Sequence, residues 1–268
     1  MPKFFVVSDI HGFYDEFIEA LDKAGFDPQN ENHWLITCGD HFDRGWQPFE
    51  VMNYLQNLPR KVLVKGNHES LFDDLCSRGY PGQHDYSNGT FDTVCDLGGA
   101  GEGNDFDTCC LLAYQRTKSF IDSMVDYFET KNYIFVHGWI PVKCEDGLPV
   151  YYRNNRKFEF YPSWRYAHHS EWEQARWWNG IDMARKGFVE PNKTIVCGHW
   201  HCSYGHYMQT MRDAIAAGGS AFDTDIDEFG PKAIWEPYYG NGVIAIDRCT
   251  AHTGQVNVLV IEDAFLED

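Results

Sequence analysis

Five short apolar runs recur along the chain, and each ends in a block of polar residues. The runs are Phe4–Val7, Trp34–Thr37, Val62–Val64, Tyr133–Val136 and Thr194–Val196. Runs of this length are typical of β-strands that are covered on both faces. Helical patterns lie between them, such as the apolar stripe of Phe13, Phe17 and Leu21. This alternation of strand and helix predicts an α/β protein.

The polar blocks contain side chains whose oxygen or nitrogen atoms can bind a metal ion. These donors are Asp9, His11, Asp40, Asn67, His137 and His199. Ligands of α/β proteins gather at the carboxyl ends of the strands, so we expect the blocks to form one site. Taken singly, each donor is more often a turn residue or a core histidine. Five blocks at five strand ends instead predict a site for divalent ions such as Mn, Fe or Zn, which take mixed oxygen and nitrogen ligands.

The blocks also resemble those of a known family. In order and spacing they are similar to the signature blocks of bacterial and phage-type phosphoprotein (serine/threonine) phosphatases, within the calcineurin-like metallophosphoesterase superfamily. The blocks are Ser8-Asp9-Ile10-His11-Gly12, Gly39-Asp40-His41-Phe42-Asp43-Arg44-Gly45, Gly66-Asn67-His68-Glu69, His137-Gly138 and Gly198-His199. The resemblance runs from Phe4 to about Glu262. It implies a four-layer αββα sandwich with two central mixed β-sheets.

The resemblance implies a metal centre with two divalent ions, with Mn preferred and Fe or Zn as alternatives. One ion would be held by Asp9, His11 and Asp40. The other would be held by Asp40, Asn67, His137 and His199. The reaction it implies is hydrolysis of a phosphate monoester by a hydroxide that bridges the two ions.

Three further residues take catalytic roles by the same resemblance. His68 would protonate the leaving oxygen, and Asp43 would orient its ring. Arg44 would bind the phosphate, which suits the two-pronged guanidinium. Relatives often carry a second phosphate-binding arginine where this chain has Gly180, so Arg176 and Arg185 are candidates to replace it. His201 is a further possible metal ligand, because the wider superfamily places a second histidine in this block.

Three functions remain open on the sequence. The first is a serine/threonine protein phosphatase, which the Gly-Asn-His-Glu block and Asp43-Arg44 favour. The alternative is a symmetrical dinucleoside tetraphosphate hydrolase or another nucleotidase, which the short layout and the Gly198-His199-Trp200 sequence resemble. The third is a scaffold that binds a partner without catalysis. It is disfavoured because all six core ligand positions and His68 are filled.

The 268 residues are expected to form a single catalytic domain, 1–268, with insertions at about 79–107 and 146–170. Two later runs, Val243–Ile246 and Val256–Ile261, flank Thr253-Gly254-Gln255 and predict a β-hairpin.

Composition limits the partners and the location. The formal net charge of −18 argues against nucleic acid, whose binding depends on Lys and Arg. The expected partner is instead a phosphorylated protein or a small phosphoester. No run approaches the ~18 apolar residues of a membrane span, and no signal-peptide pattern opens the sequence. The nine cysteines show no disulfide or zinc spacing, which predicts a reducing, cytoplasmic environment. The oligomeric state stays open.

Overall fold

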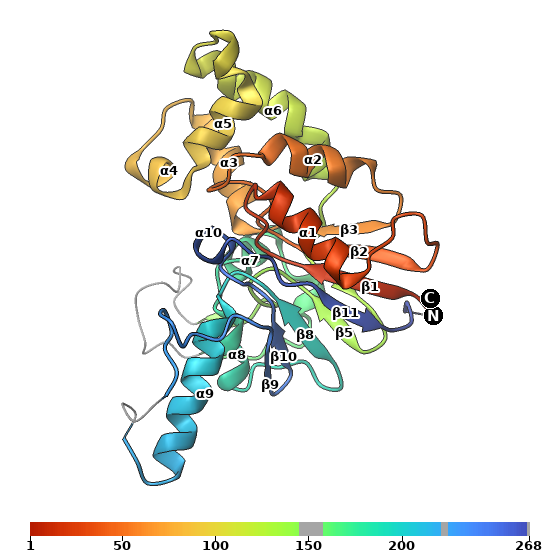
Figure 1. Ribbon diagram of the computed structural model, residues 1–268, viewed down its shortest axis with the longest axis vertical. Helices are drawn as coiled ribbons and strands as arrows, with labels where there is room; N and C mark the ends of the chain where they lie inside the picture. The colour runs from red at the N-terminus through yellow and green to blue at the C-terminus, as the bar shows by residue number, and fades with distance from the viewer. Residues whose placement is uncertain (145–157, 221–224, 267–268) are drawn as a thin grey trace.

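Two β-sheets lie face to face at the centre of the molecule, and helices cover the outer face of each (Figure 1). The computed structural model describes residues 1–144, 158–220 and 225–266. Both termini lie at the same end of the structure, beside β1 and β11 (Figure 1). This is the four-layer αββα arrangement that the family resemblance implies.

The first sheet has the strand order β11-β1-β2-β3. Its strands are β1 (Lys3–Val7), β2 (His33–Cys38), β3 (Lys61–Val64) and β11 (Leu259–Glu262). The neighbours β1, β2 and β3 are parallel, with Val6 opposite Ile36. Their carboxyl ends therefore meet at one edge of the sheet, and the polar blocks that follow them meet there too.

The second sheet has the strand order β4-β5-β8-β10-β9. Its strands are β4 (Phe128–Glu129), β5 (Tyr133–Phe135), β8 (Thr194–Cys197), β9 (Tyr238–Gly240) and β10 (Val243–Ala245). Here β5, β8 and β10 run parallel to one another. A separate two-stranded sheet pairs β6 (Lys143–Cys144) with β7 (Phe158–Glu159).

The hairpin predicted near the end of the sequence is wrong. Strand β10 pairs with β8 and β9 in the second sheet, whereas β11 pairs with β1 in the first. The residues between them form the short helix α10 (Thr250–Thr253), and Gly254 ends it with a left-handed φ of 62°. The predicted turn is thus a helix end, and the chain crosses from one sheet to the other.

Alternation of side chains along the strands builds three separate apolar clusters. Phe4 and Val6 point between the sheets and pack with Phe135 and Val196. Phe5 and its alternating neighbours point outward, because successive residues of a strand face opposite sides. The helices that cover this outer face are α1 (Tyr14–Ala24), α2 (Pro48–Asn57), α3 (Asn67–Arg78), α5 (Thr90–Gly98) and α6 (Phe106–Asp122).

The second sheet has its own helical cover. It consists of η3 (Trp164–Tyr166), α7 (His169–Ala175), α8 (Gly180–Arg185) and the start of α9 (Cys202–Ala216). Buried Trp139, Trp164 and Trp172 fill the space between these helices and the sheet. The rest of α9 projects away from the body of the molecule (Figure 1).

The predicted insertion at about 79–107 is largely helical. It contains α4 (Gln83–Asn88), α5, the single turn η1 (Ala100–Glu102) and the start of α6. Its glycines look irregular in sequence, but Gly79 and Gly99 end helices with φ of 73° and 75°. Such left-handed caps strongly favour glycine, so the composition marks helix ends here. Much of the second insertion, residues 146–157, lies outside the described residues.

None of the helices in the part of the chain that the structure describes is both long enough and apolar enough to cross a membrane. The cysteines whose side chains are described are free thiols.

Candidate metal centre

The strand ends of both sheets bring six potential ligands together around Asp40. One carboxylate oxygen of Asp40, Oδ1, lies 3.3 Å from His137 Nε2, and the other, Oδ2, lies 3.7 Å from His11 Nε2. His11 Nε2 is also 3.9 Å from Asp9 Oδ1. Two groups of donor atoms close enough to hold an ion share this carboxylate: His11, Asp40 and His68, and Asp40, His137 and His199. Asp40 thus faces two adjacent positions.

The histidine rings are oriented for metal binding. His11 Nδ1 donates a hydrogen bond to the carbonyl oxygen of Phe42 at 2.9 Å, and His137 Nδ1 donates one to that of Cys38 at 2.7 Å. These bonds fix the ring orientation, as at most protein metal sites, and turn each Nε2 toward Asp40. His137 Nε2 also lies 2.8 Å from Asn67 Oδ1, which places Asn67 in the same cluster. The Nε2 of His199 is buried and has no hydrogen-bond partner in the described residues. An ion would satisfy it, so this donor set fits a metal.

The charges of the cluster also fit a cation. Burial lowers the pKa of His199 to about 3, helped by His137, so its imidazole is neutral at physiological pH. The pKa of Asp40 is also affected by burial, which raises it, but the His137 and His68 rings outweigh burial and hold it well below its usual value. Burial alone would lower the pKa of His137, yet Asp40 raises it to about 9. The negative charge of Asp40, which raises the pKa of His137, is therefore a charge that a bound divalent ion would neutralise.

The backbone at the site is strained. Eight non-glycine residues of the described chain have positive φ, and six of them belong to the predicted site: Asp9, His11, Asp40, Asp43, Arg44 and His199. This left-handed region costs about 1–3 kcal/mol for most residues and persists only where surrounding contacts impose it. Such strain concentrates at functional sites, and here it turns side chains inward at the strand ends.

His68 lies beside the ligands and is held from behind. Its Nδ1 is 2.7 Å from Asp43 Oδ2, which leaves Nε2 facing the site, 3.8 Å from Asp40 Oδ2. Burial lowers the pKa of His68, but Asp40 and the hydrogen bond to Asp43 outweigh burial and raise it. The ring is therefore suited to carry a proton toward a leaving group. Arg44 Nη2 lies 3.3 Å from His68 Nε2, which places a guanidinium at the same spot.

Two threonines support this arrangement, and sequence analysis missed them. Thr90 Oγ1 donates to Asp43 Oδ2 at 2.6 Å, and the backbone N–H of Asp43 donates to Thr93 Oγ1 at 3.1 Å. Both threonines are buried on α5, in the segment that composition presented as an insertion. No motif identifies them in the sequence. The one feature that could have pointed to them is their spacing of three residues, which places both on one face of a helix.

Glu69 joins the loops that carry the ligands. Its carboxylate accepts hydrogen bonds from the backbone N–H groups of Gly66 at 2.7 Å, Asp40 at 3.2 Å and His41 at 2.8 Å. It also meets the His41 ring at 3.0 Å. Burial would raise the pKa of Glu69, but His41 outweighs burial and lowers it to about 2. A fully buried carboxylate thus holds the loop after β2 against the start of α3.

Glu69→Gln is expected to lower the free energy of unfolding by about 3–5 kcal/mol, because an amide group would face backbone donors in a buried site. Since the folded pKa of Glu69 lies below its ordinary value of 4.5, its contribution is complete above about pH 4.5 and is lost as the pH falls toward 2. Urea unfolding at pH 7 and at pH 3 measures both effects. Glu19→Gln, in an exposed ion pair with Lys23, is the control and should change little. An equal loss in both variants would contradict the buried role of Glu69.

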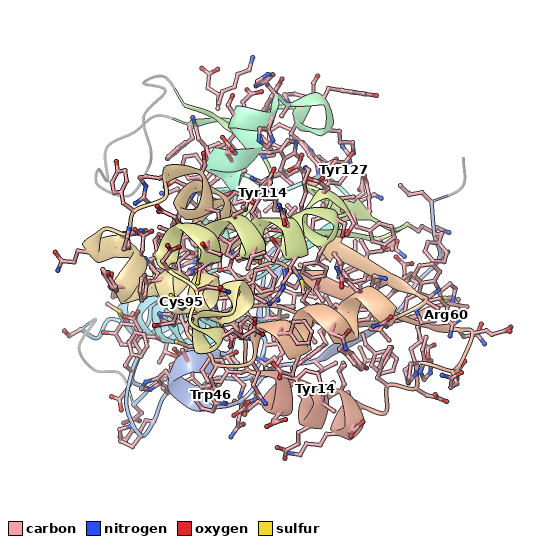
Figure 2. All side chains as sticks on the ribbon, turned by 90° about the horizontal axis from the view of Figure 1, so that it is seen from above. Tyr14, Trp46, Arg60, Cys95, Tyr114 and Tyr127 are labelled. Atoms are coloured by element: carbon pink, nitrogen blue, oxygen red, sulfur yellow. The ribbon has the colours of Figure 1, made fainter. Side chains whose placement is uncertain are left out.

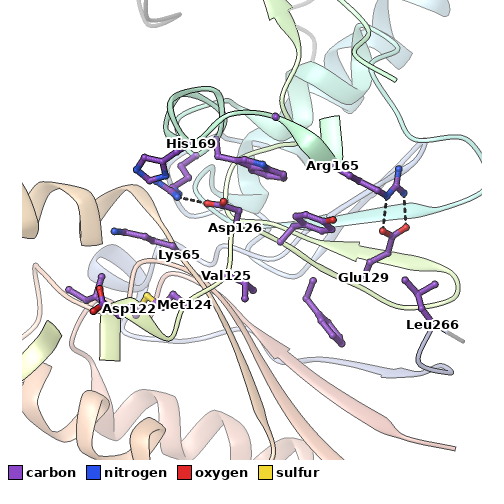
Figure 3. Close-up of a pocket in the computed structure, with 15 residues that line it drawn as sticks. Lys65, Asp122, Met124, Val125, Asp126, Glu129, Arg165, His169 and Leu266 are labelled. Atoms are coloured by element: carbon purple, nitrogen blue, oxygen red, sulfur yellow. Dashed lines mark hydrogen bonds and ion pairs between the residues drawn. The ribbon is translucent and has the colours of Figure 1, made fainter. Parts of the chain in front are cut away.

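The two candidate replacement arginines lie elsewhere. Arg176 is 3% exposed and pairs with Asp126 at 2.5 Å, with its Nη1 at 3.5 Å from Ser70 Oγ. It lines a cavity of about 760 Å³ beside β4, where Figure 3 also shows Arg165 bound to Glu129. Arg185 bonds to Asp182 on its own helix. Of the three candidate arginines, Arg44 is the one that contacts a residue of the cluster.

His201 is also turned away from the ligands. Its Nδ1 lies 2.9 Å from Ser203 Oγ and accepts the backbone N–H of Tyr204, so the ring caps the start of α9. Its Nε2 lies 3.3 Å from Glu228. The structure therefore brings the six predicted ligands, His68, Asp43 and Arg44 together, and it places His201, Arg176 and Arg185 in other contacts.

Comparison with known proteins adds a family model and a set of relatives. The model described as calcineurin-like phosphoesterase matches residues 2–203. The symmetrical bis(5'-nucleosyl)-tetraphosphatase of Klebsiella pneumoniae subsp. pneumoniae is 41% identical over 66 residues, which are 24% of this chain and 23% of that relative. The aligned part thus spans about a quarter of the length of the curated relatives.

Solved structures extend the likeness over nearly the whole chain. A protein provisionally assigned as a diadenosine tetraphosphatase has a TM-score of 0.51 and 14% identity, covering 97% of this chain and 91% of that one. A cold-active protein-tyrosine phosphatase of a psychrophilic Shewanella has a TM-score of 0.51 and 16% identity, covering 98% of this chain and 76% of that one. At such low identity the likeness concerns the fold alone.

Proposed function

Because the chain belongs to the calcineurin-like phosphoesterase family, we propose that it is a metal-dependent hydrolase of phosphate esters. The observation that carries this proposal is the shared carboxylate of Asp40, which faces two adjacent groups of donor atoms. Two divalent ions bound there would activate a water molecule at neutral pH and neutralise charge on the phosphate.

The chain's own residues divide the remaining work. Asp9, His11 and Asp40 would hold one ion, and Asp40, Asn67, His137 and His199 the other. Arg44 would bind phosphate oxygens and so fix the ester in line with the attacking water. His68 would give its Nε2 proton to the leaving oxygen, while Asp43 keeps the ring oriented and its pKa raised. A single catalytic domain, 1–268, is supported by the apolar interior that both sheets share.

For the substrate we propose a dinucleoside tetraphosphate, cleaved symmetrically. The support is the local identity of 41% to symmetrical bis(5'-nucleosyl)-tetraphosphatases. The relatives therefore favour the second of the sequence-based hypotheses over the protein phosphatase. A small, highly charged substrate also agrees with a centre that two bound divalent ions would make locally positive in a chain of net charge −18.

The test is turnover by metal-stripped protein with and without added Mn²⁺ on three substrates. These are an aryl phosphate, a phosphoserine peptide and diadenosine tetraphosphate. We expect activity to depend on the added metal, and we expect the dinucleotide to give two molecules of ADP. Preference for the peptide would return the protein phosphatase hypothesis to first place. Inactivity on all three with metal bound would contradict the catalytic proposal.

A further inference from the structure

A large aromatic side chain on the loop that carries Arg44 is exposed to solvent and is not used by the chemistry above. Trp46 is 73% exposed, although it follows Arg44 by only two residues. Seen from above, it lies at the outer edge of the molecule (Figure 2). Its indole has one ring neighbour in the described residues, Phe13, at 5.6 Å between centroids in an edge-to-face contact. One face of a tryptophan thus remains available to a ligand.

The backbone that carries Trp46 is fixed on both sides. The N–H of Gly45 donates to the carbonyl oxygen of His11 at 2.8 Å, and the N–H of Gln47 donates to that of Gly12 at 2.9 Å. The two loops are so close that a Cβ on Gly45 would lie 2.4 Å from the His11 oxygen. An exposed aromatic on a rigid backbone loses little conformational entropy when a ligand binds, which is why such residues are effective anchors.

The position of Trp46 defines the chemistry of its ligand. Two residues of extended chain span at most about 7 Å, so the Cα atoms of Trp46 and Arg44 lie within that distance of each other, and both side chains are exposed. Arg44 in turn contacts His68 at 3.3 Å. A ligand that fills both positions needs a phosphate for the guanidinium and a flat aromatic group for the indole. A nucleotide has both, and base stacking on an aromatic side chain tolerates any base.

We propose that Trp46, supported by Phe13, is the platform on which a nucleoside base of the substrate stacks while Arg44 binds its phosphate. This inference rests on the proposed function and deepens it, because it makes Trp46 the residue that distinguishes nucleotides from other phosphate esters. Since every base has a stacking face, the platform selects for the presence of a base and not for its identity.

The experiment compares AMP with ribose 5-phosphate, which lacks the base, as competitors of β-glycerophosphate turnover by the Mn²⁺-loaded full chain. In the unsubstituted protein, AMP should compete at least about 10-fold more tightly than ribose 5-phosphate, within the range of one stacked base. Trp46→Ala should reduce this ratio to about 1, and Trp46→Phe should keep most of it, because a smaller ring still stacks. Tyr239→Ala removes another exposed aromatic, on β9, and should keep the full ratio.

An unchanged ratio in Trp46→Ala would overturn the inference, as would the absence of any advantage of AMP in the unsubstituted protein. Because this readout uses a base-free substrate, it is independent of dinucleotide cleavage. Failure to release ADP from diadenosine tetraphosphate, with the AMP advantage intact and dependent on Trp46, would reject the proposed substrate and keep the platform. Normal ADP release with no role for Trp46 would do the reverse.

Discussion

Asp40→Asn is expected to lower turnover by at least about 10³-fold and to prevent the protein from retaining its metal. Each oxygen of Asp40 faces a different group of donors, so the carboxylate is the one ligand that both positions share. A side-chain amide offers one neutral oxygen and one NH2 group, which cannot replace two anionic contacts. Without bound metal the pKa of water rises from about 7 toward that of bulk water, and the nucleophile is lost at neutral pH.

Two measurements check this result: metal content after loading with Mn²⁺ and desalting, and initial rates on the preferred substrate. Asp40 Oδ1 accepts the backbone N–H of His68 at 3.0 Å, and the Asn oxygen can keep this bond, so the fold should survive. Asp74→Asn, an exposed carboxylate on α3, is the matched control and should bind metal normally. An Asp40→Asn protein that retains two ions per chain would show that the shared ligand is not Asp40.

His68→Asn is expected to separate catalysis from metal binding. Loss of a positioned general acid costs about 10²–10⁴-fold in rate, while the six ligands proposed for the ions remain in place. The loss should be largest with a poor leaving group, which needs the proton, and smallest with an aryl phosphate of low leaving-group pKa. Asp43→Asn should give a smaller loss in the same direction, because it removes the negative charge that helps to raise the pKa of His68.

Rates on an alkyl and an aryl ester, together with metal content, distinguish this role from a structural one. His169→Asn replaces an exposed histidine on α7 and is the control for the change from histidine to asparagine. If His68→Asn were as active as the unsubstituted protein on the alkyl ester, the assignment of the acid would be wrong. If it also lost metal, His68 would instead act as a ligand.

Local patterns were sufficient to predict the α/β class and five of the strands, whereas the four layers came from the family resemblance. The apolar runs became β1, β2, β3, β5 and β8, and the polar blocks at their ends meet as expected. Two contacts join residues of different blocks: Asp43 lies 2.7 Å from His68, and Asp40 lies 3.3 Å from His137. Parallel strands explain this success, because their carboxyl ends share one edge of a sheet.

Contacts between residues far apart in the sequence were not predictable in the same way. The sequence near Thr253-Gly254 is compatible with a hairpin turn and with a helix end, and only the pairing of β10 with β8 decides between them. The support of Asp43 by Thr90 crosses 47 residues and has no local signature. Likewise, His201 suits a metal in sequence, but its ring caps α9 and meets Glu228, a contact that depends on how the later chain returns.

The origin of the ligands in both sheets has a consequence for maturation of the protein. The proposed ligands follow β1, β2 and β3 of one sheet and β5 and β8 of the other, so bound ions would staple the two halves of the sandwich together. Ligand binding to the folded state alone adds stability in proportion to the logarithm of the free metal concentration. The stability of the packing between the two sheets would then depend on the metal concentration in the cell. A chain without metal would be inactive and would also unfold more readily.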